Sequence, residues 1–344
     1  MLLKKLTQLN GVSGNENAVS NFILSEISKY ADEITKDTLG NLIFYKKGKN
    51  PSGKTVGVFA HMDEVGLIAT SITDDGYIKF SQVGGLDDRI LLTQRVSVGD
   101  NAIKGIIGIK AVHLQTKDER KRVVKTEDMY IDIGAENKEE ALKFVQKGDY
   151  ISFDSGFVSL YGSRIKAKAL DDRVGCAIMM DLIKNTYDED IYFCFTVQEE
   201  TGLRGASVLS RRLNPDISFV LESTTASDTA FSPKHLYSTS LGGGPVLTNM
   251  DRGAYSDKKL NEFVSGIAKE NNIKYQYKLS ANGGNDARAL QTGASGSRVC
   301  SISLPCRYIH SPVCVADMED FDSMKALIHN VLCKINTFSA TEVK

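Results

Sequence analysis

The stretch DIYFCFTVQEE, residues 190–200, decides the fold class of this chain. Its first part, residues 190–197, is a nearly continuous apolar run, which is typical of a strand buried on both faces. A helix is predicted before this run at 173–185, and a helix at 205–212 and a strand at 217–221 are predicted after it. This alternation of helices and strands predicts an α/β domain with a mixed, largely parallel sheet flanked by helices.

Outside this stretch, residues 68–162 have a different sequence pattern, with short runs of β-branched residues separated by glycines. This pattern predicts a small β domain, with one helix expected at 138–145. A helix at 13–29 and strands at 42–45 and 55–60 are predicted before this block. Because elements of the α/β style stand on both sides of it, we expect residues 68–162 to be inserted into one domain formed by 1–67 and 163–344. Two successive domains are the alternative.

Composition and charge exclude several classes of protein. The 344 residues are 42% hydrophobic and 25% charged, which argues against disordered, collagen-like and small disulfide-rich chains. Lys and Arg number 42 and Asp and Glu 43, so the net charge of −1 gives no reason to expect a nucleic-acid or membrane partner. The start of the chain lacks a secretory apolar stretch, which predicts a cytoplasmic protein. We expect the six cysteines, which show no C-x-x-C spacing, to be reduced structural thiols and not disulfides.

One motif suggests a nucleotide site that the context argues against. Residues 48–55, GKNPSGKT, match the phosphate-loop pattern. A phosphate loop requires a helix that begins at the Lys-Thr pair. The residues that follow, 56–60, are VGVFA, and Gly57 would cost a helix about 1 kcal/mol relative to alanine. We interpret this segment as a hairpin turn at Pro51 and Ser52 between two strands.

Potential metal ligands stand at the carboxyl ends of the predicted strands and at the start of one predicted helix. Such positions converge on the ligand crevice of an open α/β sheet. Glu199 and Glu200 directly follow a buried strand, where two adjacent carboxylates need a compensating charge. The side chains concerned are His61, Asp63, Asp171, Glu199, Glu200, Glu222 and His310. This set predicts a site for two divalent cations, and imidazole and carboxylate ligands suit zinc, cobalt or manganese.

The chain resembles the tetrahedral (TET), dodecamer-forming metallo-aminopeptidases, a family that includes glutamyl and deblocking aminopeptidases and cellulase M-like proteins. The matching segments extend over nearly the whole chain. They are GVSGNE (11–16), HMDEVG (61–66), VGGLDDRILLTQRV (83–96), IDIGA (131–135), KALDDRVGCA (168–177), QEETGLRGA (198–206), GGNDA (283–287) and RYIHSPV (307–313).

The resemblance implies a fold, an activity and an assembly. It implies a phosphorylase/hydrolase-like di-zinc or di-cobalt peptidase domain, interrupted by a PDZ-like β-barrel that helps dimers to assemble into a tetrahedral dodecamer. The implied activity is the removal of N-terminal residues from short peptides with a free N-terminus. The implied cofactors are two divalent ions per subunit, zinc or cobalt, with manganese possible.

The resemblance also implies roles for individual residues. His61 would bind one ion, and Asp171 would bridge the two. Glu200 and Glu222 would hold one ion each, and His310 would complete the shell of the second ion. Asp63 would orient His61, and Glu199 would be the general base for a hydroxide shared by the two ions. Gly283, Gly284 and Asp286 would border the substrate pocket. The family more often has Asp in place of Glu222 and an acidic residue in place of Cys314.

The tetrapeptide Leu-Asp-Asp-Arg occurs twice, and only one copy can supply the bridging carboxylate. We choose Asp171 because an apolar helix is predicted directly behind it, whereas Asp87 precedes a strand-like run. The remaining histidines, His113, His235 and His329, have no ligand type at suitable spacing, and we expect them to be structural or on the surface.

Two alternative functions stay open at the level of sequence. A glycoside hydrolase would use two carboxylates without metal, at a separation of about 5 to 9.5 Å. A non-catalytic assembly protein would keep the fold and lose the chemistry, which the unusual Glu222 and Cys314 would permit.

Overall fold

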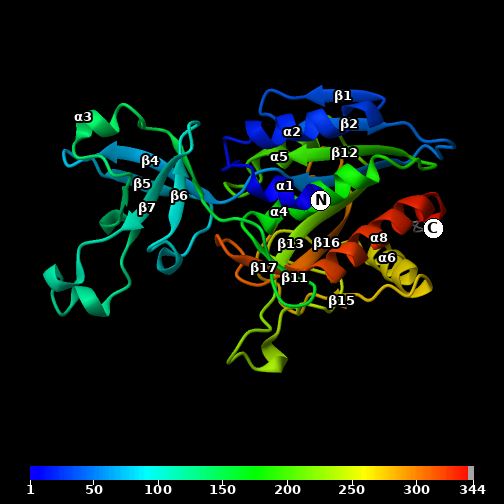
Figure 1. Cartoon of the computed structure of the whole chain (residues 1–344). Helices are drawn as coiled ribbons and strands as arrows, with labels where there is room; N and C mark the ends of the chain where they lie inside the picture. Colours follow the sequence, from blue (N-terminus) through cyan, green and yellow to red (C-terminus); the bar gives the residue numbers. More distant parts are fainter. Residues whose placement is uncertain (340–344) are drawn as a thin grey trace.

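A mixed eight-stranded sheet forms the centre of the larger part of the molecule (Figure 1). The structure, a computed structural model, describes residues 1–339. In sheet order the strands are β1 (Glu33–Lys36), β2 (Leu42–Lys46), β12 (Asp190–Thr196), β3 (Thr55–His61), β13 (Ile217–Thr225), β16 (Arg298–Cys306), β14 (Val246–Thr248) and β15 (Gln276–Tyr277). The central strands β12, β3, β13 and β16 are parallel to one another, so their carboxyl ends meet at one edge.

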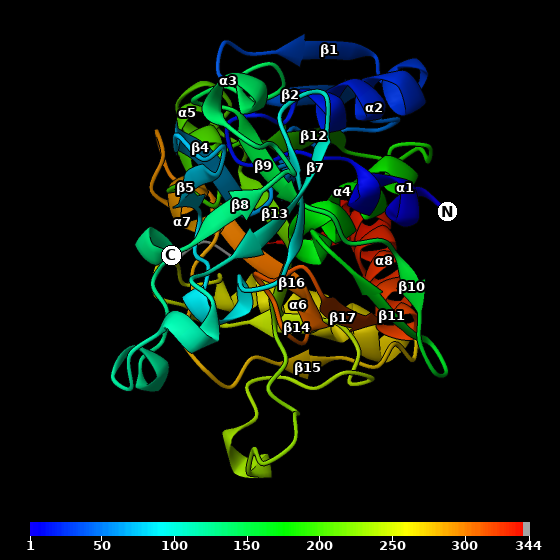
Figure 2. The same cartoon turned by 60° about the vertical axis from the view of Figure 1, so that its left-hand side comes forward.

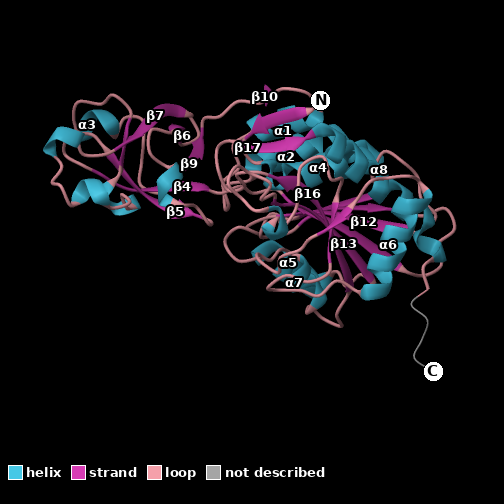
Figure 3. Ribbon diagram, turned by 90° about the horizontal axis from the view of Figure 1, so that it is seen from below, coloured by secondary structure: helices cyan, strands magenta, loops and turns pink. Residues whose placement is uncertain are grey.

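Helices cover both faces of this sheet (Figure 3). One face packs against α1 (Leu2–Gln8), α2 (Asn17–Ile27), α4 (Leu170–Leu182), α6 (Lys258–Glu270) and α8 (Met318–Lys334), and the other against α5 (Arg204–Arg212) and α7 (Ala287–Gln291). Side chains alternate between the two cores, as a strand requires: Val58 packs with the first set of helices and its neighbour Phe59 with the second. Burial on both faces explains why these strands read as continuous apolar runs.

The β-rich block forms a closed antiparallel barrel beside the sheet, and this barrel faces the viewer in Figure 2. Its strands are β4 (Gly66–Ile72), β5 (Ile78–Val83), β8 (Tyr130–Asp132), β7 (Ile103–Gly108), β6 (Arg95–Val98) and β9 (Tyr150–Phe153). They enclose a separate apolar core. Strands from before and after the barrel share the main sheet, an arrangement that is consistent with an inserted barrel.

The limits of the barrel strands differ from the predicted block 68–162. β4 begins two residues earlier, at Gly66. β10 (Val158–Ser159) lies within the predicted block, yet it pairs with β11 (Arg164–Ala167), which pairs in turn with β17 (Cys314–Asp317) in a small third sheet. The end of the block thus returns to the larger part of the molecule before residue 162.

Three local predictions need correction. The helix expected at 13–29 is α2 followed by one 3₁₀ turn, Ser28–Tyr30, and the helix expected at 138–145 is the single turn α3 (Lys138–Ala141). The prediction of a hairpin turn at Pro51 and Ser52 is wrong. The strands on either side of these residues, β2 and β3, are not paired with each other, because β12 lies between them. The sequence around Pro51 carries no signal that a strand formed by residues 190–196 is inserted between these two strands. Thr55 does begin a strand, so no helix starts at the phosphate-loop match.

All six cysteines are free thiols, as expected, and Cys333 is the exposed one. None of the helices within residues 1–339 combines the length and hydrophobicity that a membrane span requires.

Candidate metal centre

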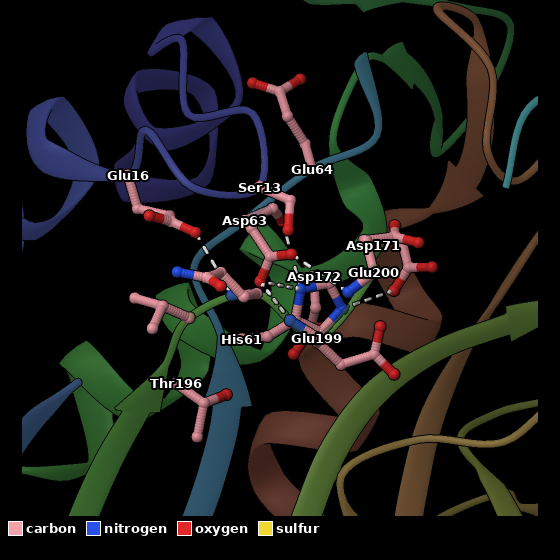
Figure 4. A network of polar contacts seen from close by, with 12 residues as sticks. Ser13, Glu16, His61, Asp63, Glu64, Asp171, Asp172, Thr196, Glu199 and Glu200 are labelled. Atoms are coloured by element: carbon pink, nitrogen blue, oxygen red, sulfur yellow. Dashed lines mark hydrogen bonds and ion pairs between the residues drawn. The ribbon is translucent and has the colours of Figure 1, made fainter. Parts of the chain in front are cut away.

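Predicted ligand side chains come together at the carboxyl edge of the parallel strands (Figure 4). β3, β12, β13 and β16, with the segments that follow them, present His61, Glu199, Glu200, Glu222 and His310. Glu222 lies within β13 and not after it, because this strand extends to Thr225. A cavity of about 460 Å³ is lined by these carboxylates and by His310, while His61 is buried behind it.

His61 forms a first cluster with two carboxylates. Its Nε2 atom lies 3.4 Å from Asp171 Oδ1 and 3.8 Å from Glu222 Oε2. On the other side of the ring, Nδ1 lies 3.4 Å from Asp63 Oδ1 and 3.1 Å from the Asp63 backbone oxygen. Asp63 therefore holds one nitrogen of the imidazole while the other faces the two carboxylates, an arrangement that is common for metal-binding histidines.

His310 forms a second cluster that shares Asp171 with the first. Its Nε2 atom lies 3.3 Å from Asp171 Oδ2 and 3.4 Å from Glu200 Oε2. Its Nδ1 atom is 2.9 Å from the backbone oxygen of Gly85, to which it donates a hydrogen bond. In each cluster, the potential ligand atoms lie within 4.8 Å of one another. The geometry is that of two neighbouring sites with one common carboxylate.

The two Leu-Asp-Asp-Arg segments lie in different environments. Asp171 stands at the start of α4, where it and Asp172 have non-helical backbone angles, and the helix behind them is buried. Asp87 instead binds the Arg89 side chain at an exposed 3₁₀ turn. The structure therefore brings Asp171, and not Asp87, to the predicted ligands.

The carboxylates of the site are held away from water. Burial, together with neighbouring carboxylates, raises the pKa of Glu199 and that of Glu222 well above the usual range for glutamate. Burial likewise raises the pKa of Glu200 to about 7. Burial acts on Asp171 in the same direction, but the neighbouring imidazoles of His310 and His61 lower its pKa overall. Acidic groups that raise one another's pKa values form a cluster that a bound cation would stabilise.

Several buried carboxylate oxygens have no hydrogen-bond partner among residues 1–339. One oxygen each of Asp171, Glu200 and Glu222 is in this state. Such an oxygen is costly unless it has a ligand. Three carboxylates with unpartnered oxygens beside two imidazoles fit a pair of divalent cations, which take oxygen and imidazole ligands.

Asp63 connects two of the segments that carry potential ligands, the end of β3 with His61 and the turn with Glu199 and Glu200. Its carboxylate is fully buried, and it accepts hydrogen bonds from the backbone amides of Glu199 at 3.0 Å and Glu200 at 3.1 Å. The same side chain that holds His61 thus also fixes the turn after β12.

The predicted substrate-binding residues lie in two places. Gly283 and Gly284 line the cavity. Asp286 does not line it, because its buried side chain accepts a hydrogen bond from Thr196 Oγ1 at 2.6 Å beneath the site. Sequence reasoning missed Lys278, which lines the cavity and donates to the Asn282 backbone oxygen. A lysine in a polar stretch carries no sequence signal for such a position.

The remaining residues singled out from sequence lie outside the clusters. His113 and His235 are exposed, and His329 lies near Tyr187. Cys314 is buried beside the His310 turn, where its thiol donates to the backbone oxygens of Tyr308 and Ser311.

Comparisons with known proteins show the family of this chain. The sequence profile of the M42 glutamyl aminopeptidases matches residues 40–327. A putative aminopeptidase of Acetivibrio thermocellus is 42% identical over 334 residues, which cover 96% of this chain and 98% of that protein. The structure also matches the aminopeptidase APDkam598 of the archaeon Desulfurococcus kamchatkensis, with a TM-score of 0.93, 34% identity and coverage of 100% of this chain and 98% of that one.

A second solved structure is that of the Pyrococcus horikoshii TET1 peptidase, which can assemble into a tetrahedron or a large octahedral shell. It matches with a TM-score of 0.86 and 35% identity, over 96% of this chain and 98% of that one. These matches extend over nearly the whole chain and confirm the resemblance found in the sequence. The chain belongs to the M42 glutamyl aminopeptidase family.

Proposed function

We propose that this chain is an aminopeptidase that uses two divalent cations per subunit, zinc or cobalt, with manganese as a third candidate, to release N-terminal residues from short peptides. The observation that carries the proposal is the position of Asp171. Its two carboxylate oxygens face His61 on one side and His310 on the other, at 3.4 and 3.3 Å, and Asp171 lines the cavity.

Each residue of the two clusters has a role in this proposal. His61, Asp171 and Glu222 would hold one cation, and Asp171, Glu200 and His310 the other. When bound, the cations polarise a peptide carbonyl and lower the pKa of a water molecule. The longer side chain of Glu222 is compatible with this role, because its Oε1 atom has no hydrogen-bond partner among the described residues.

Glu199 is the general base of the proposed reaction. Its carboxylate lines the cavity, and its neighbour Glu200 belongs to one cluster. Glu199 would accept a proton from the attacking water and pass it to the leaving amine. A carboxylate that lines the cavity suits this task, because it can take a proton and return it.

The proposal includes a homo-oligomer, a tetrahedral dodecamer built from dimers. The match to the TET1 peptidase over nearly its full length supports it. Light scattering on the purified protein measures the assembly, and a monomer at micromolar concentration would contradict it.

Removing the cations is expected to abolish peptidase activity. EDTA treatment followed by desalting should stop the release of nitroaniline from aminoacyl p-nitroanilides, and added Zn²⁺, Co²⁺ or Mn²⁺ should restore it. Elemental analysis of the active protein should give two ions per subunit. Full activity in a sample from which the ions are demonstrably gone would contradict the proposal.

The same samples distinguish the alternative functions. A glycoside hydrolase would cleave a β-glucan, and would do so after EDTA treatment as before. The family match and the imidazoles beside the carboxylates favour the peptidase. A non-catalytic assembly protein would bind the ions and cleave neither class of substrate.

Lys278 is expected to favour peptides with an acidic N-terminal residue. It is the one lysine or arginine that lines the cavity in the described chain, and the other lining residues beyond the clusters are mostly serine, threonine and asparagine. Asp251 also lines the cavity, but its Oδ1 atom accepts two backbone amides, from Gly253 and Ala254. The ammonium group is therefore the charge that is freer to pair with a substrate.

Replacement of Lys278 by Met should lower kcat/KM for a glutamyl p-nitroanilide about tenfold relative to a leucyl one, which is the size expected for loss of one partly buried ion pair. Lys278→Glu should lower it further. Lys258→Met, at an exposed lysine of α6, is the control. A glutamyl-to-leucyl ratio that stays constant across these variants would remove Lys278 from the specificity pocket.

A further inference from the structure

The segment GVSGNE, residues 11–16, contacts two of the chain segments that carry proposed cation ligands, those that contain His61 and Glu200. The backbone of Gly11 and Ser13 pairs with Glu64, directly after the His61–Asp63 segment. Ser13 Oγ lies 3.0 Å from Thr201 Oγ1, directly after Glu200. Glu16 is 7% exposed, and its Oε1 atom accepts hydrogen bonds from the amides of Gly14 at 2.7 Å and of Gln198 at 3.2 Å.

Three successive backbone amides after β12 donate to buried carboxylates. The amide of Gln198 donates to Glu16, and those of Glu199 and Glu200 donate to Asp63. Dashed lines in Figure 4 mark polar contacts of Glu16 and of Asp63 within this network. Two acidic side chains thus hold the turn through its main chain and leave the side chains of Glu199 and Glu200 free to face the cavity.

The turn needs such a restraint because its backbone conformation is unfavourable. Gln198 has φ of +55°, in the left-handed region that is unfavourable for a residue with a side chain. The hydrogen bond from its amide to the Glu16 carboxylate stabilises this conformation. Without Glu16, the turn would have alternative conformations in which Glu199 and Glu200 point elsewhere.

The position of the 11–16 segment is also restricted on the side that faces the barrel. Gly14 has φ of +95°, and a Cβ atom there would lie 2.5 Å from the Tyr150 hydroxyl of the barrel. A glycine at this position lets the segment turn between the barrel and the sheet, so that the Gly14 amide reaches the Glu16 carboxylate.

We propose that Glu16 is a positioning residue, which holds the Gln198–Thr201 turn so that Glu199 and Glu200 face the reacting groups. This inference rests on the proposed function for the roles of Glu199 and Glu200. Among the hydrogen bonds within residues 1–339, the one that joins Glu16 to the turn comes from the Gln198 amide. The contribution of Glu16 is therefore the placement of the turn and not ligation or proton transfer.

Glu16→Ala and Glu16→Gln separate positioning from charge. Glutamine keeps an oxygen that accepts both amides, and alanine removes it. We expect Glu16→Ala to bind Co²⁺ about tenfold more weakly in one of its two binding steps, as titration of the metal-free protein measures. We also expect kcat to fall about tenfold with KM within a factor of two, and Glu16→Gln to restore both values to within about threefold of the unmodified protein.

Amide hydrogen exchange reads the turn directly and does not depend on activity. In Glu16→Ala, peptides covering residues 198–203 should exchange at least about tenfold faster. The matched control is Asp320→Ala: Asp320 is also buried and accepts two loop amides, from Gly242 and Gly244, outside the cavity. This control should lower the melting temperature and leave Co²⁺ binding and the exchange of 198–203 unchanged.

The outcomes are distinct. If Glu16→Ala loses thermal stability as Asp320→Ala does but keeps Co²⁺ affinity and slow exchange at 198–203, Glu16 is a structural residue and the inference is overturned. If Glu16→Ala does not fold, Ser13→Ala replaces it, and unchanged exchange at 198–203 in that variant overturns the inference. Faster exchange and weaker Co²⁺ binding in a protein that cleaves no peptide would sustain the positioning role and refute the proposed peptidase function.

Discussion

Glu199→Gln is expected to reduce kcat by about 10²–10⁴-fold, the usual contribution of a general acid–base group, while both cations stay bound. The amide is nearly isosteric with the carboxylate, but it cannot accept the proton of the attacking water. Glu199 lies in a third group of potential ligand atoms with His61 and Glu200, but it belongs to neither of the clusters that share Asp171. In the proposed assignment its replacement should therefore leave the ligand sets intact. Steady-state kinetics on an aminoacyl p-nitroanilide and elemental analysis of the same sample measure the two effects.

The neighbouring residue provides the contrast to this variant. Glu200→Gln removes a member of the second cluster, and it should lower cation content as well as rate. Retention of half or more of the unmodified rate by Glu199→Gln would exclude Glu199 as the base. Loss of cations from that variant would make it a ligand instead.

Asp171→Asn is expected to weaken the binding of both cations by about 10–100-fold or more. Replacement of a residue that merely hydrogen-bonds to a metal ligand already has an effect of that size. Asp171 is common to the two clusters, and an amide offers no negative charge to either. His310→Ala should affect the second cluster alone. Titration of the metal-free variants with Co²⁺, followed by absorption spectroscopy, resolves the two binding steps.

The second Leu-Asp-Asp-Arg segment supplies a matched control for this experiment. Asp87→Asn makes the same chemical change in the same tetrapeptide, at an exposed position that pairs with Arg89. It should leave both binding steps unchanged. Unaltered cation binding in Asp171→Asn, or weakened binding in Asp87→Asn, would reverse the choice between the two segments.

Much of the architecture was predictable because its signals are local. The runs that became β12 and β3 are buried on both faces, and they remain apolar over nearly their whole length. The position of ligand types at strand ends follows from the parallel arrangement, since parallel neighbours end at one edge. Those two rules led to His61, Glu199 and Glu200 without any knowledge of strand order.

Strand order and strand length were not predictable in this way. The position of β12 between β2 and β3 depends on pairing between residues more than 130 positions apart, for which the turn at Pro51 gives no signal. β13 continues past Leu221 through polar residues, whereas the prediction from hydrophobic pattern ended the strand at Leu221. In the structure Ser223 and Thr224 of this segment are buried, and Ser223 Oγ donates to the Leu170 backbone oxygen at 3.0 Å.

The residues of the site that sequence reasoning missed act through main-chain atoms or through position alone. Glu16 accepts the Gln198 amide, and Gly85 offers its backbone oxygen to His310. Such contacts leave no pattern of residue types, because the partner atoms are common to every residue. Lys278 carries a charge, but only the fold brings it to the cavity.

The contact between Gly85 and His310 has a consequence for the modularity of this chain. Gly85 follows the barrel strand β5, yet its carbonyl oxygen sets the direction of an imidazole from the far end of the chain, and Gly84 beside it lies against Glu200. The inserted unit is therefore not an interchangeable attachment. A barrel transplanted from a relative must place a backbone carbonyl oxygen at the same point beside His310. In designs that exchange barrels, the junction at residues 83–85 is therefore more important to preserve than the outer surface of the barrel.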